Sequence, residues 1–353
     1  MTISKRGLAS LLPMLVATAA CGGTTAGSTS APVAVVPPAA APVATPSPAP
    51  SPTPSPTPTP EVVAPPVVVA PAAPVTSGYK RVVYVGNDVP DLTAYEAWLG
   101  KHADGIQIHT GRAGWSDWST SLPWVIDRWK GVDRTIYWSI PLFAEGATLE
   151  EASAGAYNDY YKSAAQKLAA AYPNAAKIYV RTGWEFNGTW QPWAAKGKEA
   201  AYRGAFRQFV AAFRSVSDRF VFEWCPNNGD FGTNPEDSYP GDDVVDIIGM
   251  DFYYDHRWDS ADPVAAWTYK LNERYGLAWH QSFAQAHGKR TAYSEWGVSG
   301  NGDGPYVALA AQWFASHDVV YASYWNSNAA FAGKLSDDQY PAVSAAYRAL
   351  AGS

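Results

Sequence analysis

The pattern of apolar positions changes at about residue 77. Beyond this point, short runs of β-branched and aromatic residues alternate with longer stretches in which apolar residues recur at helical spacing. Runs that are apolar almost throughout are typical of parallel strands that are buried on both faces. We predict eight strands: Arg81–Gly86, Asp104–His109, Arg134–Pro141, Lys177–Glu185, Phe220–Pro226, Val244–Tyr253, Thr291–Gly297 and Val319–Asn326.

Helical stretches fall between these strands, among them Leu149–Ala171, Lys198–Val216 and Pro305–Ser316. Eight β/α units in a segment of this length fit a closed barrel. An open, doubly wound sheet would usually carry a glycine-rich phosphate turn after its first strand, and the residues from Gly86 to Pro90 contain none. We therefore predict an α/β fold, a single (β/α)8 TIM barrel over residues 77–353.

The first 76 residues have a different character. A basic start, an apolar run from Leu8 to Ala17 and small residues before Cys21 predict an export signal over residues 1–20. The segment from Leu15 to Cys21 resembles a bacterial lipobox, so we expect a lipid on Cys21 that attaches the protein to a membrane. A secretory signal with a chance cysteine is the alternative. The expected location is outside the cytoplasm, at the cell surface or in the periplasm.

Residues 21–76 read as a linker. Between residues 31 and 76 there are 16 prolines, and Glu61 is the only charged residue. Such a segment cannot bury enough apolar surface to fold, and proline favours the polyproline II conformation. We therefore expect a disordered but semi-rigid stalk that separates the membrane anchor from the barrel.

Charge and cysteine content exclude several classes of function. The formal net charge is −6, and no run of basic residues, such as Lys5-Arg6, is longer than two, so nucleic acid is not an expected partner. Two cysteines, Cys21 and Cys225, cannot form a disulfide framework or a thiolate cluster, and Cys225 reads as an inert buried thiol. The histidines lack the spacing of metal ligands. We expect a monomer without a metal or cofactor.

Two glutamates are predicted at the ends of strands, among aromatic residues. The fourth strand ends near Glu185 and the seventh near Glu295. In a TIM barrel these ends carry the chemistry, and two carboxyl groups ~5–5.5 Å apart are what retaining glycoside hydrolysis requires. Strand alternation predicts that Glu185 shares a face with Arg181, and Glu295 with Tyr293. Rim salt bridges are the structural alternative for both carboxylates.

Several motifs together resemble glycoside hydrolase family 26. They are Arg181-Thr-Gly-Trp-Glu185-Phe-Asn-Gly188-Thr-Trp190, Trp224-Cys-Pro-Asn227, Asp246-Ile-Ile-Gly-Met-Asp251-Phe-Tyr253, Glu295-Trp-Gly297 and Trp325. The resemblance implies a retaining (β/α)8 enzyme with Glu185 as acid/base and Glu295 as nucleophile. The family includes endo-β-mannanases, which typically have histidine before the acid/base. This chain has Trp184 there, so we expect unbranched mannan to be a poor substrate.

The polar residues near the two glutamates suggest supporting roles. Tyr253 could keep Glu295 ionised through its phenol, and Arg181 could orient a carboxylate. Asn187, Asn227 and Asp251 are candidates for binding sugar hydroxyls, with turn or barrel-interior positions as the alternative.

Aromatic residues at strand ends are candidates for sugar contacts. Trp325 is expected to stack under the reacting sugar, and Trp190 and Trp193 to line the cleft beside the leaving group. Trp184 either contacts sugar hydroxyls or packs behind the strand. His109 ends the second strand and could also contact substrate.

The predicted function is a lipid-anchored β-glycoside hydrolase. It would cleave a β-linked polysaccharide, mannan-like or a bacterial exopolysaccharide, internally and by double displacement. A non-catalytic carbohydrate-binding lipoprotein on the same barrel is the alternative, but a binding protein has no need of both Glu185 and Glu295. Trimming of the producer's own exopolysaccharide would suit a surface-tethered enzyme as well as foraging does.

Overall fold

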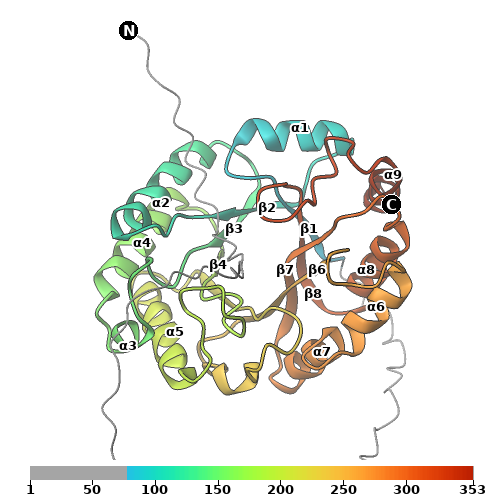
Figure 1. Ribbon diagram of the computed structural model, residues 1–353. Coiled ribbons are helices and arrows are strands. Elements are labelled where there is room, and N and C mark those ends of the chain that lie inside the picture. The colour runs from blue at the N-terminus through green and yellow to red at the C-terminus, as the bar shows by residue number, and fades with distance from the viewer. Residues whose placement is uncertain (1–77, 353) are drawn as a thin grey trace, which may run out of the picture. The chain divides into compact units, whose positions relative to one another are not determined.

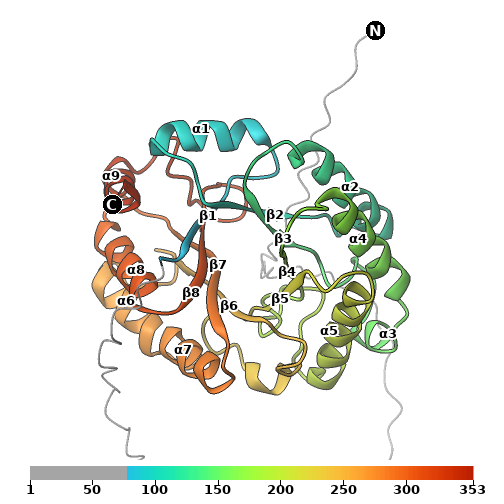
Figure 2. The ribbon, with the colours of Figure 1, turned by 180° about the vertical axis from the view of Figure 1, so that it is seen from behind.

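A computed structural model describes residues 78–352, which form a closed barrel of eight parallel strands surrounded by helices (Figures 1 and 2). The strands pair in chain order, and β1 closes the barrel against β8. Their bounds are β1 Lys80–Tyr84, β2 Gly105–His109, β3 Thr135–Ser139, β4 Ile178–Arg181, β5 Phe220–Trp224, β6 Ile247–Tyr254, β7 Arg290–Val298 and β8 Val319–Trp325.

The helices cover the outside of the barrel and bury their apolar sides against the strands (Figure 1). In α5, for example, Phe209 and Phe213 are fully buried and stack with ring centroids 4.4 Å apart. The helices are α1 Val89–Leu99, α2 Trp115–Trp129, α3 Leu149–Ser153, α4 Asn158–Ala171, α5 Glu199–Arg214, the short 3₁₀ helix η1 Pro235–Ser238, α6 Pro263–Asn272, α7 Leu277–Ala286, α8 Gly304–Ser316 and α9 Pro341–Gly352.

The predicted TIM barrel and its eight strands are confirmed, with two local differences. The helix expected over residues 149–171 is interrupted between α3 and α4, where Gly155 has a φ of 85°. The fourth strand ends at Arg181, earlier than predicted, because Gly183 and Glu185 have φ values of 61° and 54°. An extended strand cannot contain left-handed residues. Glu185 therefore lies in the loop after β4 and not on the strand.

A β-bulge in β7 changes the expected orientation of Glu295. Gly249 of β6 pairs with Ala292 and Asp251 pairs with Glu295, so β7 has one extra residue between these pairs. The side chain of Tyr293 packs outward against Phe314 of α8, with centroids 4.8 Å apart. Glu295 nevertheless faces the barrel interior. The prediction that Tyr293 and Glu295 share a face is wrong, because strict alternation does not continue through a bulge.

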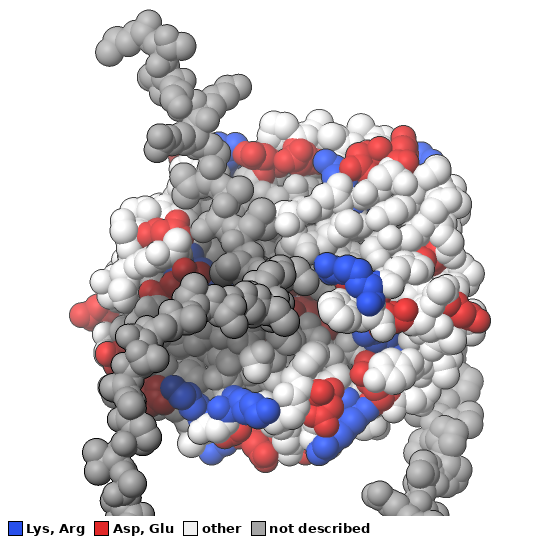
Figure 3. All heavy atoms as spheres, viewed as in Figure 1, with Lys and Arg blue, Asp and Glu red and all other residues white. Residues whose placement is uncertain are grey.

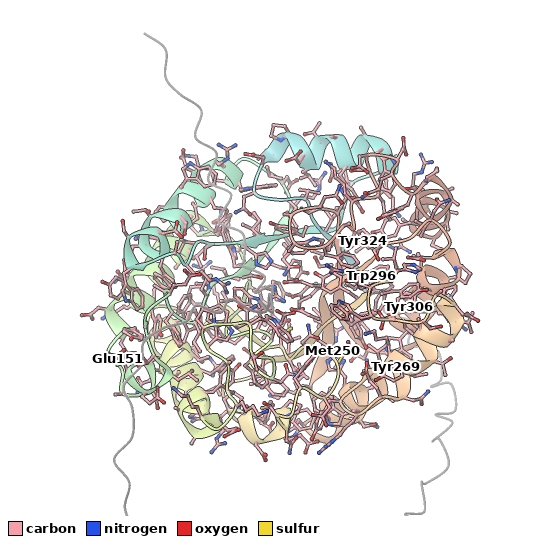
Figure 4. All side chains as sticks on the ribbon, in the orientation of Figure 1. Glu151, Met250, Tyr269, Trp296, Tyr306 and Tyr324 are labelled. Atoms are coloured by element: carbon pink, nitrogen blue, oxygen red, sulfur yellow. The ribbon has the colours of Figure 1, made fainter. Side chains whose placement is uncertain are left out.

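Aromatic packing fixes the outer side of β7 and β8. Trp296 of β7 lies against Tyr324 of β8, with ring centroids 5.0 Å apart at 86°, and both are labelled in Figure 4. Burial of such large rings contributes most of the packing area available to a core. This side of the strands is therefore structural, whereas the opposite side carries the polar residues described below.

The signal (residues 1–20), Cys21 and the linker (residues 21–76) lie outside the described residues. Within residues 78–352, none of the helices combines the length and the apolar character needed to cross a membrane. On the face that Figure 3 shows, Lys and Arg side chains are interspersed with Asp and Glu.

Candidate active site

The loop after β4 positions Glu185, and three N–H groups bind its carboxyl. The backbone N–H of Glu185 donates to the carbonyl of Cys225 at 2.8 Å, which holds the left-handed residue in place. Trp190 Nε1 and Gln191 Nε2 donate to Oε2 at 2.6 and 2.9 Å. Asn227 Nδ2 donates to Oε1 at 2.6 Å. Burial, and then the negative charge of Glu295, raise the pKa of Glu185 despite these donors.

The hydrogen bonds indicate where a proton on Glu185 resides. Both lone pairs of Oε2 accept an N–H, from Trp190 and Gln191, whereas Oε1 accepts only from Asn227. A protonated carboxyl group can accept three hydrogen bonds and donate one. Oε1 therefore has the free lone pair that can hold a proton directed at a substrate oxygen. The site is compatible with Glu185 as a proton donor.

The opposite conditions hold at Glu295. Arg181 Nη2 donates to Oε1 at 2.5 Å, and the Tyr253 hydroxyl donates to Oε2 at 2.7 Å. His109 Nε2 lies 3.5 Å from Oε1. Burial alone would raise the pKa of Glu295, but the charge of Arg181 and these hydrogen bonds hold the pKa below its usual value. Glu295 is thus an ionised carboxylate suited to nucleophilic attack.

Arg181 is itself fixed by a buried ion pair. Its Nη1 donates to both carboxylate oxygens of Asp251 at 2.7 Å, and the side chains of both residues are almost fully buried. Cys225 Sγ lies 3.3 Å from Asp251 Oδ1. Asp251 is inaccessible to a sugar, so its role is to position Arg181 and not to bind hydroxyl groups as the sequence suggested.

His109 and Trp184 form the wall next to Arg181. Their rings are perpendicular at 5.5 Å, and the Arg181 guanidinium lies 5.0 Å from the Trp184 ring centroid. Burial lowers the pKa of His109 to about 4, so this imidazole is neutral at neutral pH. Trp184 therefore lies beside two site residues, and little of its surface is exposed.

Two other predicted contact residues are buried supports. Asn187 forms two hydrogen bonds with the backbone of Asn227, at 2.7 and 2.8 Å, and is fully buried. Trp193 is also fully buried, and its Nε1 donates to the carbonyl of Trp184 at 2.6 Å. We therefore assign neither Asn187 nor Trp193 to substrate contact, because their polar groups are satisfied by protein. Asn227 remains half-buried and binds Glu185 directly.

The aromatic candidates Trp190 and Trp325 lie near different carboxylates. Trp190 binds Glu185 and remains exposed. Trp325 ends β8 and stacks on Tyr84, which ends β1, with centroids 4.1 Å apart and planes 23° from parallel. The Trp325 ring also meets that of Tyr253, the hydrogen-bond partner of Glu295, at 6.4 Å.

The sequence did not reveal Gln191 or Arg112. Arg112 Nη1 donates to the amide oxygen of Gln191, so the amide NH₂ of Gln191 must face Glu185. Nothing in the sequence marks these two residues, because they lie in separate loops that meet only in the fold. Tyr84 could have been found, since it ends a strand as Trp325 does.

Glu223 was also missed. It lies inside the barrel, where its carboxylate accepts hydrogen bonds from the hydroxyls of Ser294 and Tyr321. Its burial raises its pKa. The available signal was a lone acid in the otherwise apolar run from Phe220 to Trp224. Among the described residues, no group of three or more His, Cys, Asp or Glu side chains has an arrangement that could hold a metal ion.

Comparison with known proteins gives a consistent result. Residues 144–294 match the family model for glycosyl hydrolase family 26. A mannan endo-1,4-β-mannosidase from Bifidobacterium adolescentis is 34% identical over 130 residues, which cover 35% of this chain and 12% of that protein. A β-1,3-xylanase from a Vibrio species is 22% identical over 198 residues, covering 54% of this chain and 42% of that protein. The chain thus spans less than half the length of these curated relatives.

Solved structures share the architecture. A double mutant of the Cellulomonas fimi endo-β-1,4-mannanase superimposes with a TM-score of 0.53 at 19% identity, covering 76% of this chain and 71% of that one. At this level of identity the similarity concerns the fold alone. It agrees with the closed barrel of eight parallel strands described above.

Proposed function

Because this chain belongs to glycosyl hydrolase family 26, we propose that it is a retaining β-glycoside hydrolase that cleaves a β-linked polysaccharide internally. The observation that carries this assignment is the contrast between two glutamates. Arg181 and Tyr253 hold Glu295 ionised, whereas burial and the charge of Glu295 favour the protonated form of Glu185. A pair of carboxyl groups with opposite preferences supplies both a nucleophile and an acid.

The reaction then proceeds in two displacements. In the first, Glu295 attacks the anomeric carbon while the bond to the leaving oxygen breaks, and the proton on Oε1 of Glu185 moves to that oxygen. A covalent glycosyl ester forms on Glu295. In the second, Glu185, now ionised, removes a proton from water, and the water oxygen displaces Glu295 from the anomeric carbon. Each displacement inverts the configuration, so the product retains the β configuration.

Two variants with different expected behaviour test these roles. Glu295→Ala should lose more than about a thousandfold in kcat, because no nucleophile remains. Added azide can enter the vacated space and should yield the α-glycosyl azide from an activated aryl β-glycoside. Glu185→Ala should instead keep activity on dinitrophenyl glycosides, whose leaving group needs no proton, and yield the β-glycosyl azide.

Asp127→Asn, in the last turn of α2 and paired with Lys130, is the matched control and should behave like the wild type. If Glu295→Ala retains wild-type rates, or if both variants give the same azide anomer, the assignment of roles is wrong.

We infer a mannan-like polysaccharide or a bacterial exopolysaccharide as the substrate class. Curated relatives act on mannan and on β-1,3-linked xylan, so the relatives alone favour no single sugar. Trp184 offers one N–H donor and a large apolar ring where mannanases of the family typically have histidine. Assays for new reducing ends on β-mannans, β-glucans, β-xylans and bacterial exopolysaccharides would identify the substrate. Unbranched mannan should be cleaved poorly, and Trp184→His should improve its cleavage.

A non-catalytic carbohydrate-binding protein is the competing function. It would bind one of these polysaccharides without releasing reducing ends, and Glu295→Gln would leave its affinity unchanged. Such a protein would have no use for hydrogen bonds that give Glu185 and Glu295 different protonation states. We therefore favour the enzyme.

We also propose that the enzyme is exported and held at a membrane by a lipid on Cys21. This rests on the sequence alone: a basic start, an apolar run, small residues before Cys21 and a proline-rich linker after it. A linker of this composition would let the barrel reach polymers beyond the membrane surface.

A further inference from the structure

We propose that Phe231 and Lys196 extend the sugar-binding surface of Trp190 on the leaving-group side, and that together they bind the second leaving-group sugar of the polysaccharide. This inference rests on the proposed function and adds on which side of the cleaved bond this surface binds the polysaccharide. Nothing in the sequence marked Phe231 or Lys196, because each becomes relevant only through its position next to Trp190.

Trp190 marks the leaving-group side through its contact with the acid. Its Nε1 donates to Glu185 at 2.6 Å, and Glu185 must reach the oxygen of the leaving group. A Cβ at Gly188 would collide with the six-membered ring of Trp190, so one face of the indole lies flat on Gly188. The indole is nevertheless 37% exposed. The exposed part of Trp190 is therefore available to a sugar.

Phe231 continues this surface from another loop. It lies between β5 and η1, and its ring stands at 87° to that of Trp190 with centroids 4.9 Å apart. Phe231 is also 37% exposed, so part of its ring is accessible to a ligand. Two perpendicular rings form a corner in which the C–H face of one sugar can stack while the next sugar meets the second ring.

The loop that carries Phe231 is held in place from both sides. Asp230 Oδ1 accepts the backbone N–H of Gly232 at 2.8 Å, and Arg274 Nη1 binds the same carboxylate at 2.9 Å. Gly232 has a φ of 75°, a conformation that glycine adopts without strain. Phe231 is thus presented by an ordered turn, and its exposure results from the backbone geometry.

Lys196 supplies a polar group at the same corner. A Cβ built on Gly232 would lie 2.8 Å from Lys196 Nζ, so the ammonium group lies against the residue after Phe231. Lys196 is exposed, and no ion pair within residues 78–352 involves it. An ammonium group with free hydrogens next to the turn that carries Phe231 fits a polyhydroxylated ring, which needs stacking and hydrogen-bond donors together.

The test compares substrates that do and do not reach this corner. Phe231→Ala should lower kcat/KM about tenfold on β-1,4-mannohexaose or β-1,3-xylohexaose, whichever the wild type cleaves faster, mainly through KM. On an aryl β-glycoside, whose leaving group ends before Phe231, the loss should be about twofold or less. With a hexaose ¹⁸O-labelled at its reducing end, cleavage should move toward that end. Phe231→Trp should restore the wild-type pattern.

Trp124→Ala removes another exposed aromatic residue, on the outer side of α2, and is the matched control that should change neither substrate. Equal losses on both substrates, or an unchanged cleavage position, would overturn the assignment of Phe231. If the wild type hydrolyses neither the aryl glycosides nor any polysaccharide of the substrate panel, the proposed function fails. Calorimetric titration of the two hexaoses then tests whether Phe231 contributes to sugar binding. Weaker binding by Phe231→Ala than by the wild type supports this contribution, and equal or absent binding refutes it.

Discussion

Tyr253→Phe isolates one hydrogen bond in the site. The hydroxyl donates to Glu295 Oε2 at 2.7 Å, and the ring packs against Phe331 with centroids 4.6 Å apart. Phenylalanine keeps that ring contact and removes only the donor. A hydrogen bond to a charged group stabilises by about 1.5–3 kcal/mol, and one pKa unit corresponds to about 1.4 kcal/mol. The pKa of Glu295 should therefore rise by roughly 1–2 units.

The direction of the effect on activity depends on which protonation state of Glu295 reacts. The nucleophile must be ionised, so activity is lost as the pH falls through the pKa of Glu295. In Tyr253→Phe the acid limb of kcat/KM should move to higher pH by about 1–2 units. The basic limb, which reports Glu185, should move much less. Initial rates on an aryl β-glycoside across the pH range provide the measurement.

Stability offers an independent check of the same bond. The folded-state pKa of Glu295 lies below its unfolded value, so its contribution to stability is present above the unfolded pKa and is lost as the pH falls through the folded pKa. Tyr253→Phe should therefore unfold more easily than wild type at pH 7, and the difference should shrink in acid. An unmoved acid limb, together with a stability difference independent of pH, would refute this account of Glu295.

Three further changes test other parts of the site and the anchor. Gln191→Leu removes an N–H donor that favours ionised Glu185, so the pKa of Glu185 should rise. The basic limb of kcat/KM should then move to higher pH by about one unit, and an unmoved limb would count against this contact. Gly188→Ala should displace Trp190 and lower kcat/KM on hexaoses about tenfold. The displacement should also alter the tryptophan fluorescence. Unchanged kinetics would mean that the indole does not lie on Gly188. Cys21→Ser should release the protein from membranes or block its processing, as fractionation would show, and unchanged membrane association would exclude a lipid on Cys21.

The strands and the general position of the site can be predicted from the sequence because they depend on local patterns. Each barrel strand is buried on both faces and carries mostly apolar residues, which produces a run that is easily recognised. The chemistry of a TIM barrel is confined to one end of the strands, so glutamates near those ends are candidates without any knowledge of contacts. Glu185, Glu295, Arg181 and Tyr253 were found in this way, and the structure brings all four together.

The orientation of individual side chains could not be predicted in the same way. Glu185 leaves the strand at a left-handed residue, and Glu295 follows a bulge, so alternation fails at both positions. Asn187 and Trp193 lie close to the acid in sequence, but their side chains point into the protein, where backbone groups satisfy them. Contacts between loops, such as the one between Arg112 and Gln191, have no periodic signature.

The most direct test of the proposed mechanism is to trap the covalent intermediate. A 2-deoxy-2-fluoro-β-glycosyl fluoride, made from the disaccharide that the substrate panel identifies, forms the ester quickly and hydrolyses it slowly. Mass spectrometry should show one added glycosyl group on the intact protein, and peptide digestion should place it on Glu295. A label on any other residue, or turnover without a label and with an α-configured first product, would contradict a retaining mechanism with Glu295 as nucleophile.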